Sequence, residues 1–276
     1  KIDSDSNCVY YRGVVMSSPA VVKDRYVVVG SNYKVYLLEA GKSGIEKISE
    51  FETKGRVQAS PAVNRKGDKV VVGTCYGRVY LFDLDEGEGL VERDKFDIGG
   101  TIHRNPAIVP VDGREYVLIS CDDGDLYLFR IGDRIEYIDR AFAGIPTAPA
   151  VTEIDGDVYA FVGSEFCIFY LFKVSKNGLK LIKKERTPKG YIARWEPSIT
   201  NIGGEKYVLA SSWGYCHLYK IERNGFREKF TRFAALGYQQ YTPAITQIGN
   251  RKVAAAVCEK IGKKEVVPWT LNRIRR

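Results

Sequence analysis

The chain has 276 residues, of which 45% are hydrophobic, and its 42 Lys and Arg against 34 Asp and Glu give a formal net charge of +8. A chain of this length can bury a large core, and no apolar run reaches the ~18 residues that a membrane-spanning helix needs. The positive charge is modest and is spread along the chain apart from the Arg-rich residues 272–276, so it fits an acidic partner or simple solubility and does not by itself indicate nucleic acid, which we regard as an unlikely partner.

A short pattern recurs six times along the chain and predicts its architecture. A Pro-Ala or Pro-Ser step occurs at Pro19, Pro61, Pro106, Pro149, Pro197 and Pro243. A glycine precedes each step, at Gly13, Gly55, Gly100, Gly144, Gly190 and Gly237. Repeats of ~40–45 residues that can each hold four short strands are typical of β-propeller blades.

The second repeat shows the expected order of strands. Ser60–Val63 begins an inner strand, and the breaker-rich residues 64–68 form a turn. Residues 69–74 form a wholly apolar strand, as expected where both faces of a sheet are packed. Residues 78–82 alternate as a third strand, and residues 90–98 are a polar outer strand. Two-residue hairpin signals stand at the first turn of later repeats: Asp112-Gly113, Asp155-Gly156, Gly203-Gly204 and Gly249-Asn250.

The two ends of the chain complete each other. The sixth repeat has three predicted strands and no outer strand, whereas residues 7–13 resemble the end of an outer strand that has no blade of its own. We therefore predict a single all-β domain over residues 1–276, a six-bladed β-propeller with four antiparallel strands per blade, closed by the N-terminal strand. The blades are expected to start near Ser18, Ser60, Asn105, Ala148, Glu196 and Thr242.

The repeat resembles the PQQ-like (quinoprotein alcohol dehydrogenase-like) β-propeller repeat. Ser60–Val63, Val71–Thr74 and Gly77–Asp83 carry the resemblance best, and Asp122–Leu128 is a second close match. The resemblance covers nearly the whole chain. It implies a propeller fold, in a family that includes quinone-cofactor dehydrogenases, outer-membrane assembly scaffolds and sensor ectodomains, so it does not fix a function.

The sequence departs from the dehydrogenases of that family. Those enzymes carry a tryptophan docking motif in most of eight blades, whereas this chain has only Trp195, Trp213 and Trp269. They also carry an adjacent cysteine pair beside the cofactor, and no two cysteines are neighbours here. We therefore expect no cofactor, PQQ included.

The six cysteines fall about one per repeat with no metal-ligand spacing, and we interpret them as small buried residues rather than a disulfide framework. Free thiols favour a cytoplasmic location. A location outside the cell stays open because the chain begins at Lys1, so a leader could have been removed. A single Met among abundant Lys and Glu is in keeping with a thermophilic source.

Candidate binding residues come from radially equivalent positions. In a propeller, the loops entering the inner strands and the turns between second and third strands lie on one face, around the central channel. The polar, cationic and aromatic residues at these positions are Gln58, His103, Arg104, Arg194, Trp195, Gln240, Tyr241, Tyr33, Tyr76, Trp213, Tyr215 and His217. They would contact a ligand or partner, or else they would hydrogen-bond the backbone and fill the channel mouth.

No candidate has a clear catalytic or metal pattern. His103 has no carboxylate partner at a recognisable spacing, which favours a polar lining residue over a catalytic base. Cys216 and His217 are adjacent and should point to opposite faces of a strand, against a Cys-His dyad. Asp122, Asp123 and Asp125 fit an ordinary blade turn better than a Ca²⁺ site. No metal site is expected.

The sequence therefore favours a non-enzymatic propeller that binds a protein or peptide partner at the channel-mouth face. A small-ligand sensor or an enzyme that uses the same central pocket is the alternative. Binding to nucleic acid or another anionic surface is the weaker one. The partner's identity and the oligomeric state are left open by the sequence.

Overall fold

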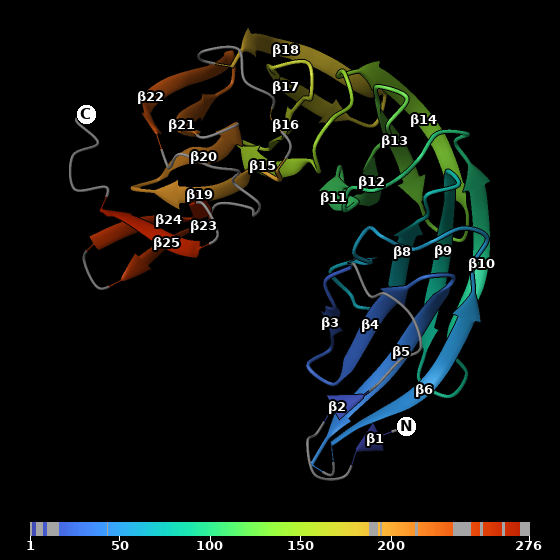
Figure 1. Cartoon of the computed structure of the whole chain (residues 1–276). Coiled ribbons are helices and arrows are strands. Elements are labelled where there is room, and N and C mark those ends of the chain that lie inside the picture. The colour runs from blue at the N-terminus through green and yellow to red at the C-terminus, as the bar shows by residue number, and fades with distance from the viewer. Residues whose placement is uncertain are drawn as a thin grey trace. The chain divides into compact units, whose positions relative to one another are not determined.

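The structure is a computed structural model that describes residues 2–3, 8–9, 17–42, 44–187, 193, 195–212, 215–233, 244–248, 251–260 and 263–270. Every regular element among these residues is a β-strand (Figure 1), as the sequence predicts. A helix long and apolar enough to cross a bilayer is not found in this part of the chain.

Five four-stranded antiparallel sheets follow one another, each built from consecutive strands in chain order. Sheet 1 contains β3 (Ala20–Val22), β4 (Tyr26–Ser31), β5 (Lys34–Gly41) and β6 (Gly44–Glu52). Sheet 2 contains β7 (Ala62–Val63), β8 (Lys69–Gly73), β9 (Arg78–Asp85) and β10 (Gly89–Asp97). Sheet 3 contains β11 (Ala107–Val111), β12 (Arg114–Ser120), β13 (Asp125–Ile131) and β14 (Ile135–Phe142).

The later sheets have the same order. Sheet 4 contains β15 (Ala150–Ile154), β16 (Asp157–Gly163), β17 (Ile168–Ser175) and β18 (Gly178–Arg186). Sheet 5 contains β19 (Ser198–Ile202), β20 (Glu205–Ser212), β21 (Tyr215–Glu222) and β22 (Gly225–Phe233). A sheet of three described strands follows, with β23 (Ala244–Ile248), β24 (Arg251–Lys260) and β25 (Lys263–Thr270), and a two-stranded sheet pairs β1 (Ile2–Asp3) with β2 (Cys8–Val9).

The first strand of each sheet begins two residues after the start predicted from the Pro step. These strands begin at Ala20, Ala62, Ala107, Ala150, Ser198 and Ala244. The proline thus stands just before the strand, where its missing N–H removes no ladder hydrogen bond.

The tight first-hairpin turns are also confirmed where they are described. Val111 pairs with Arg114 across a two-residue loop in which Asp112 and Gly113 have φ of 49° and 73°. Asp155-Gly156 and Gly203-Gly204 have the same two positive φ angles, which is the geometry of a type I′ turn. Gly249-Asn250 lies outside the described residues.

The chain divides into two compact units. Unit 1 comprises Lys1–Asp123 and Tyr127–Ile138, and unit 2 comprises Gly124–Leu126 and Asp139–Arg276. The closure of a six-bladed ring by residues 7–13, and with it the single domain, stays a prediction: β2 pairs with β1, residues 10–13 lie outside the described residues, and β23–β25 form the C-terminal sheet.

Consecutive sheets within each unit pack face to face. In unit 1 the first strands β3, β7 and β11 contact one another in turn, and the outer strands β6 and β10 contact each other. Unit 2 shows the same contacts between β15, β19 and β23 and between β18 and β22. The apolar core lies between the sheets: Phe82 faces the cluster shared with sheet 1, and Leu81 faces the one shared with sheet 3. The second strands, such as β8, are consequently buried on both faces, as predicted.

Outer strands are tied to the next sheet by a recurrent side-chain hydrogen bond. The β6, β10 and β18 strands each contain a β-bulge, and the residue after the bulge reaches the strand that follows the last hairpin turn of the next sheet. The bonds join Ser49 Oγ to the Leu90 N–H (3.1 Å), Asp94 Oδ2 to the Ile135 N–H (2.9 Å), Asp139 Oδ2 to the Leu179 N–H (2.8 Å) and Lys183 Nζ to the Phe226 carbonyl (2.7 Å). These groups, which we call interblade ties, stand about one repeat apart in sequence.

Candidate functional site

Three turns and two loops of unit 1 form one continuous surface, which we call the turn face. The turns are those at residues 32–33, 74–77 and 121–123, and the loops are residues 53–59 and 98–105. Loop 53–59 bonds backward to the first turn (Val57 N–H to the Asn32 carbonyl, 2.9 Å) and forward to the second (Cys75 N–H to the Arg56 carbonyl, 2.9 Å). Loop 98–105 makes the equivalent two bonds. The Ile102 N–H donates to the Thr74 carbonyl of the second turn (3.2 Å), and the Asp122 N–H of the third turn donates to the Thr101 carbonyl (2.9 Å).

Close contacts with glycine explain why the loops lie so near the turns. A Cβ on Gly55, whose φ is +101°, would lie 3.0 Å from the Tyr76 side chain, and one on Gly100 would lie 2.5 Å from Cys121 Sγ. A side chain at either position would push the loop away from the turn. The recurrent glycines Gly55 and Gly100 therefore allow each loop to lie close to the neighbouring turn.

An exposed tyrosine pair lies on the first two turns of the turn face. Tyr33 and Tyr76 occupy equivalent turns of sheets 1 and 2, and they are 44% and 61% exposed. A side-chain hydrogen bond with Tyr33 raises the pKa of Tyr76. The sequence analysis placed both residues on one face, and the structure brings them into contact.

A histidine–carboxylate contact lies on the same face. His103 Nε2 is 3.3 Å from Asp122 Oδ2, and both side chains are about one-third exposed. The next residue, Asp123, accepts a 2.6 Å hydrogen bond from the Tyr127 hydroxyl. The sequence analysis found no carboxylate at a recognisable spacing from His103; the structure supplies one from a turn 19 residues away, which only the folded sheet brings near.

The neighbouring thiol does not extend this pair into a nucleophilic site. Cys121 is buried, and burial raises its pKa to about 12. A thiol in this environment stays protonated near neutral pH, whereas a nucleophilic cysteine needs a lowered pKa. Among the described residues, no group of three or more His, Cys, Asp and Glu is placed to hold a metal ion.

The other candidates of unit 1 lie near the ends of the same two loops, where each loop approaches the first strand of the next sheet. Gln58 and Arg104 are half-buried on the loops that lead to β7 and β11, and each takes part in an interaction. They border the turn face and are less accessible than the tyrosine pair.

In unit 2 the structure separates the predicted residues. Trp195 and Tyr215 are half-buried, whereas His217 is 0% exposed. His217 Nε2 lies 2.7 Å from Ser212 Oγ, and the rings of Phe169 and Tyr219 pack against it. Its expected position at an open mouth was wrong for a physical reason: it lies within β21, where residues 216–219 are all buried. Arg194, Trp213, Gln240 and Tyr241 lie outside the described residues.

Unit 2 also carries an exposed aromatic pair that the list of candidates missed. Phe166, in the turn between β16 and β17, is 53% exposed, and Phe142 at the end of β14 is 61% exposed. Their ring centroids are 6.4 Å apart. Gly144 repeats the role of Gly55, since its Cβ would lie 2.6 Å from the Phe166 ring. Equivalence with the Tyr76 turn was the signal that could have identified this pair.

The comparisons with known proteins agree on the fold. No family model matches the sequence, and no curated protein matches it. Among solved structures, Sqt1 of Saccharomyces cerevisiae is 13% identical, with a TM-score of 0.74 over 96% of this chain and 74% of its own. BamB of Moraxella catarrhalis is 12% identical, with a TM-score of 0.63 over 93% of this chain and 77% of its own.

A third similar structure is Sqt1 of Chaetomium thermophilum, 14% identical, with a TM-score of 0.70 over 89% of this chain and 66% of its own. Identities this low carry information about the fold alone. They support the β-propeller part of the predicted resemblance, while the PQQ-like repeat family itself stays a prediction. The chain has an all-β, β-propeller-like fold.

Proposed function

We propose that this chain is a non-enzymatic β-propeller module that binds a protein or peptide partner through the turn face. The observation that carries the proposal is the side-chain hydrogen bond between Tyr33 and Tyr76, two large side chains that are both exposed beyond 40%. Tyrosine is among the residue types that contribute most to protein interfaces, because its ring gives apolar contact and its hydroxyl gives a directed hydrogen bond.

The surroundings of the pair support the same use. The turn face is held by backbone hydrogen bonds from both loops, so its shape is fixed before a partner arrives, and less conformational entropy is lost on binding. His103 and Asp122 add a donor and an acceptor beside the aromatic surface. The exposed Phe142 and Phe166 give unit 2 an equivalent aromatic contact.

Catalysis at this face is the less favoured alternative. The His103–Asp122 contact is the observation for it, since such a pair can move a proton. The neighbouring Cys121 thiol is buried with its pKa raised, which is the wrong direction for a nucleophile.

Nucleic acid or another anionic surface would concern unit 2 rather than the turn face. By sequence, unit 1 has 19 Lys and Arg and 21 Asp and Glu, which gives −2. Unit 2 has 23 and 13, which gives +10, so the positive charge is not spread evenly as the sequence analysis expected. Under this alternative, affinity for DNA would fall steeply with salt and would be indifferent to Tyr33 and Tyr76.

Photo-crosslinking tests the proposal. A benzoylphenylalanine placed at Tyr76 is expected to capture a discrete protein from an extract of the native source, and the same protein should be captured from Tyr33. Tyr137, 43% exposed on the outer strand β14, is the matched control position and should not capture it. With the purified partner, Tyr76→Ala should weaken binding at least about tenfold, as expected of an interface hot spot. Equal capture from all three positions, or from none, would contradict the proposal.

A further inference from the structure

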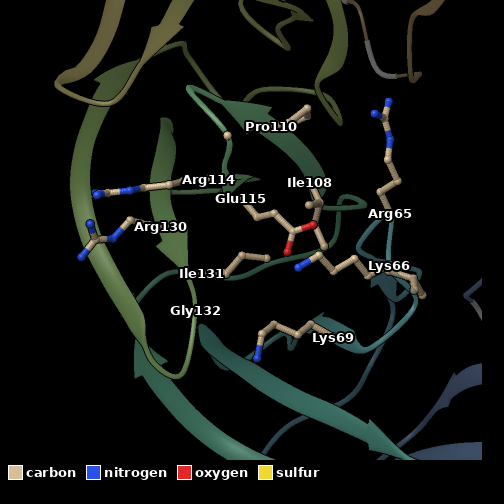
Figure 2. Close-up of a pocket in the computed structure, with 12 residues that line it drawn as sticks. Arg65, Lys66, Lys69, Ile108, Pro110, Arg114, Glu115, Arg130, Ile131 and Gly132 are labelled. Atoms are coloured by element: carbon tan, nitrogen blue, oxygen red, sulfur yellow. The ribbon is translucent and has the colours of Figure 1, made fainter.

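A cavity of about 830 Å³ opens between sheets 2 and 3 of unit 1 (Figure 2). It lies beside the first-hairpin turns, at the ends of the strands opposite to the turn face. Its volume falls within the range of about 300–1,000 Å³ that is usual for small-molecule sites. Nothing in the proposed protein-binding function uses it.

The cavity exists because two equivalent turns differ in length. The turn of sheet 2 spans residues 64–68, whereas that of sheet 3 has only Asp112 and Gly113. Where sheet 2 meets sheet 1, a Cβ on Gly67 would lie 3.1 Å from Val22 and Lys23, so that gap is filled. A Cβ on Gly113 would meet nothing within 4 Å. The shorter turn therefore leaves open the space that is closed one sheet earlier.

The inner wall of the cavity is apolar. Val63, Ile108 and Ile131 line it, and Ile108 and Ile131 belong to or pack against the core cluster between sheets 2 and 3. A ligand here could bury an aliphatic group against the edge of the core, with a gain of about 25 cal/mol for each Å² of apolar surface removed from water.

Side chains of both charges project into the same space. Figure 2 shows Lys66 and Glu115 close together in the cavity, Lys69 apart from them, and Arg114 and Arg130 extending away. Lys69 Nζ is already paired with Asp83 (3.0 Å), and Glu115 is held by a 2.8 Å hydrogen bond from the Asn64 amide. Lys66 forms no ion pair with any residue that the structure describes.

We propose that this cavity binds a free apolar α-amino acid. The ligand's carboxylate would lie on Lys66, its ammonium on Glu115, and its side chain against Ile108 and Ile131. A fixed carboxylate beside an uncompensated ammonium suits a ligand that carries both charges, because a simple carboxylate would be repelled by Glu115 and a simple amine by Lys66. The apolar wall formed by Ile108 and Ile131 favours a ligand with an aliphatic side chain next to its two charged groups.

Isothermal titration calorimetry of the full chain with three probes tests this inference. L-leucine should bind, and both 4-methylpentanoate, which lacks the ammonium, and 3-methylbutylamine, which lacks the carboxylate, should bind at least about tenfold more weakly. No heat of binding with leucine up to about 10 mM, or equal binding of leucine and 4-methylpentanoate, would overturn the proposal.

Variants then tie the binding to the cavity. Lys66→Met and Glu115→Gln should each weaken leucine binding at least about tenfold, the magnitude of one lost charged hydrogen bond. Lys66 is exposed, so its replacement should leave the fold intact, which a thermal melt would check. Arg65→Gln is the matched control, since Arg65 shares the turn with Lys66 and Figure 2 shows it directed away from the charged group. If all three variants bind leucine like the parent, the cavity is not the site.

This test is independent of the proposed function. The Tyr33 and Tyr76 substitutions remove the partner contact at the other end of the strands, and they should leave leucine binding unchanged. A failure of either experiment therefore does not decide the other.

Discussion

The carboxylate of Asp94 accepts a hydrogen bond of 2.9 Å from the backbone N–H of Ile135, in the next sheet of unit 1. Ile135 is buried, and its N–H follows a tight turn. The bond thus satisfies a backbone group of one sheet with a side chain of its neighbour. This interblade tie can be tested by substitution.

Asp94→Ala should lower the free energy of unfolding by about 1–2 kcal/mol, because it removes the hydrogen bonds from the Ile135 and Lys95 N–H groups and leaves the buried Ile135 N–H without its acceptor. Asp94→Asn keeps a carbonyl oxygen at this position and should recover most of the loss. Urea titration followed by far-UV circular dichroism measures both. The control is Asp133→Ala, an exposed aspartate in the neighbouring turn; a loss as large as that of Asp94→Ala would show that the tie contributes nothing specific.

Gly73→Ala should be destabilising although the backbone at Gly73 is not in the left-handed region. The added Cβ would lie 2.5 Å from Ile102 Cγ2 and 3.2 Å from Ile102 Cβ, and overpacking of this kind costs about 1–3 kcal/mol. Combining it with Ile102→Ala should cost less than the sum of the two single changes, since the methyl group that clashes is then absent.

Thermal and urea unfolding of the four proteins in this cycle measure that coupling. Gly132→Ala is the control, because a Cβ there would meet nothing within 4 Å. Strict additivity of the Gly73 and Ile102 changes would mean that the two residues do not press on each other as the structure places them.

The buried His217 should make the stability of the protein depend on pH. Burial lowers the pKa of His217 from its ordinary value of 6.5 to about 4. Below pH 6.5 the unfolded chain binds a proton at this residue that the folded protein does not, so stability falls as the pH drops from 6.5 toward 4. The difference between the two pKa values corresponds to about 3 kcal/mol in full.

His217→Gln removes the titration and keeps a polar group beside Ser212. The free energy of unfolding of this variant should therefore fall less than that of the parent between pH 7 and pH 4.5. Urea titrations of both proteins at the two pH values measure the difference. Parallel pH profiles would show that His217 does not contribute to the acid sensitivity.

The four cysteines whose side-chain burial the structure describes should differ in reactivity. Cys121 and Cys216 are buried, whereas Cys75 and Cys167 are half-buried, and the thiolate is the reactive form. Burial raises the pKa of Cys121 to about 12. N-ethylmaleimide under native conditions should modify Cys75 and Cys167 well before Cys121 and Cys216, as measured by peptide mass spectrometry over time. Early modification of Cys121 would contradict its described environment.

The strands were predictable because their signals are local. The Pro step sets the start of each first strand, and Asp112-Gly113 fixes both a turn type and the pairing of the residues beside it. The run of valines in β8 also indicates burial on both faces without reference to any other part of the chain.

The site was predictable only in part, because its contacts join residues from different sheets. Tyr33 and Tyr76 were identified by reading equivalent turns in register. The His103–Asp122 contact depends on how closely loop 98–105 approaches the turn at residues 121–123, which no local sequence pattern predicts. His217 was misplaced because β21 is packed on both faces, so that Cys216 and Leu218 on either side of it are equally buried. The cavity follows from a difference in length between the turns at residues 64–68 and 112–113; the sequence shows that difference, but not the space it leaves between the two sheets.

The interblade ties have a consequence for how a protein of this kind can change in size. Each tie links a polar group to an atom one repeat further along, so duplication or deletion of a whole repeat preserves every such link except at the junction. A cut inside a repeat would separate donors from acceptors in two places at once. Insertion or deletion of a complete repeat therefore breaks fewer interblade ties than a change of any other length. We expect proteins built this way to gain or lose residues in whole repeats during evolution.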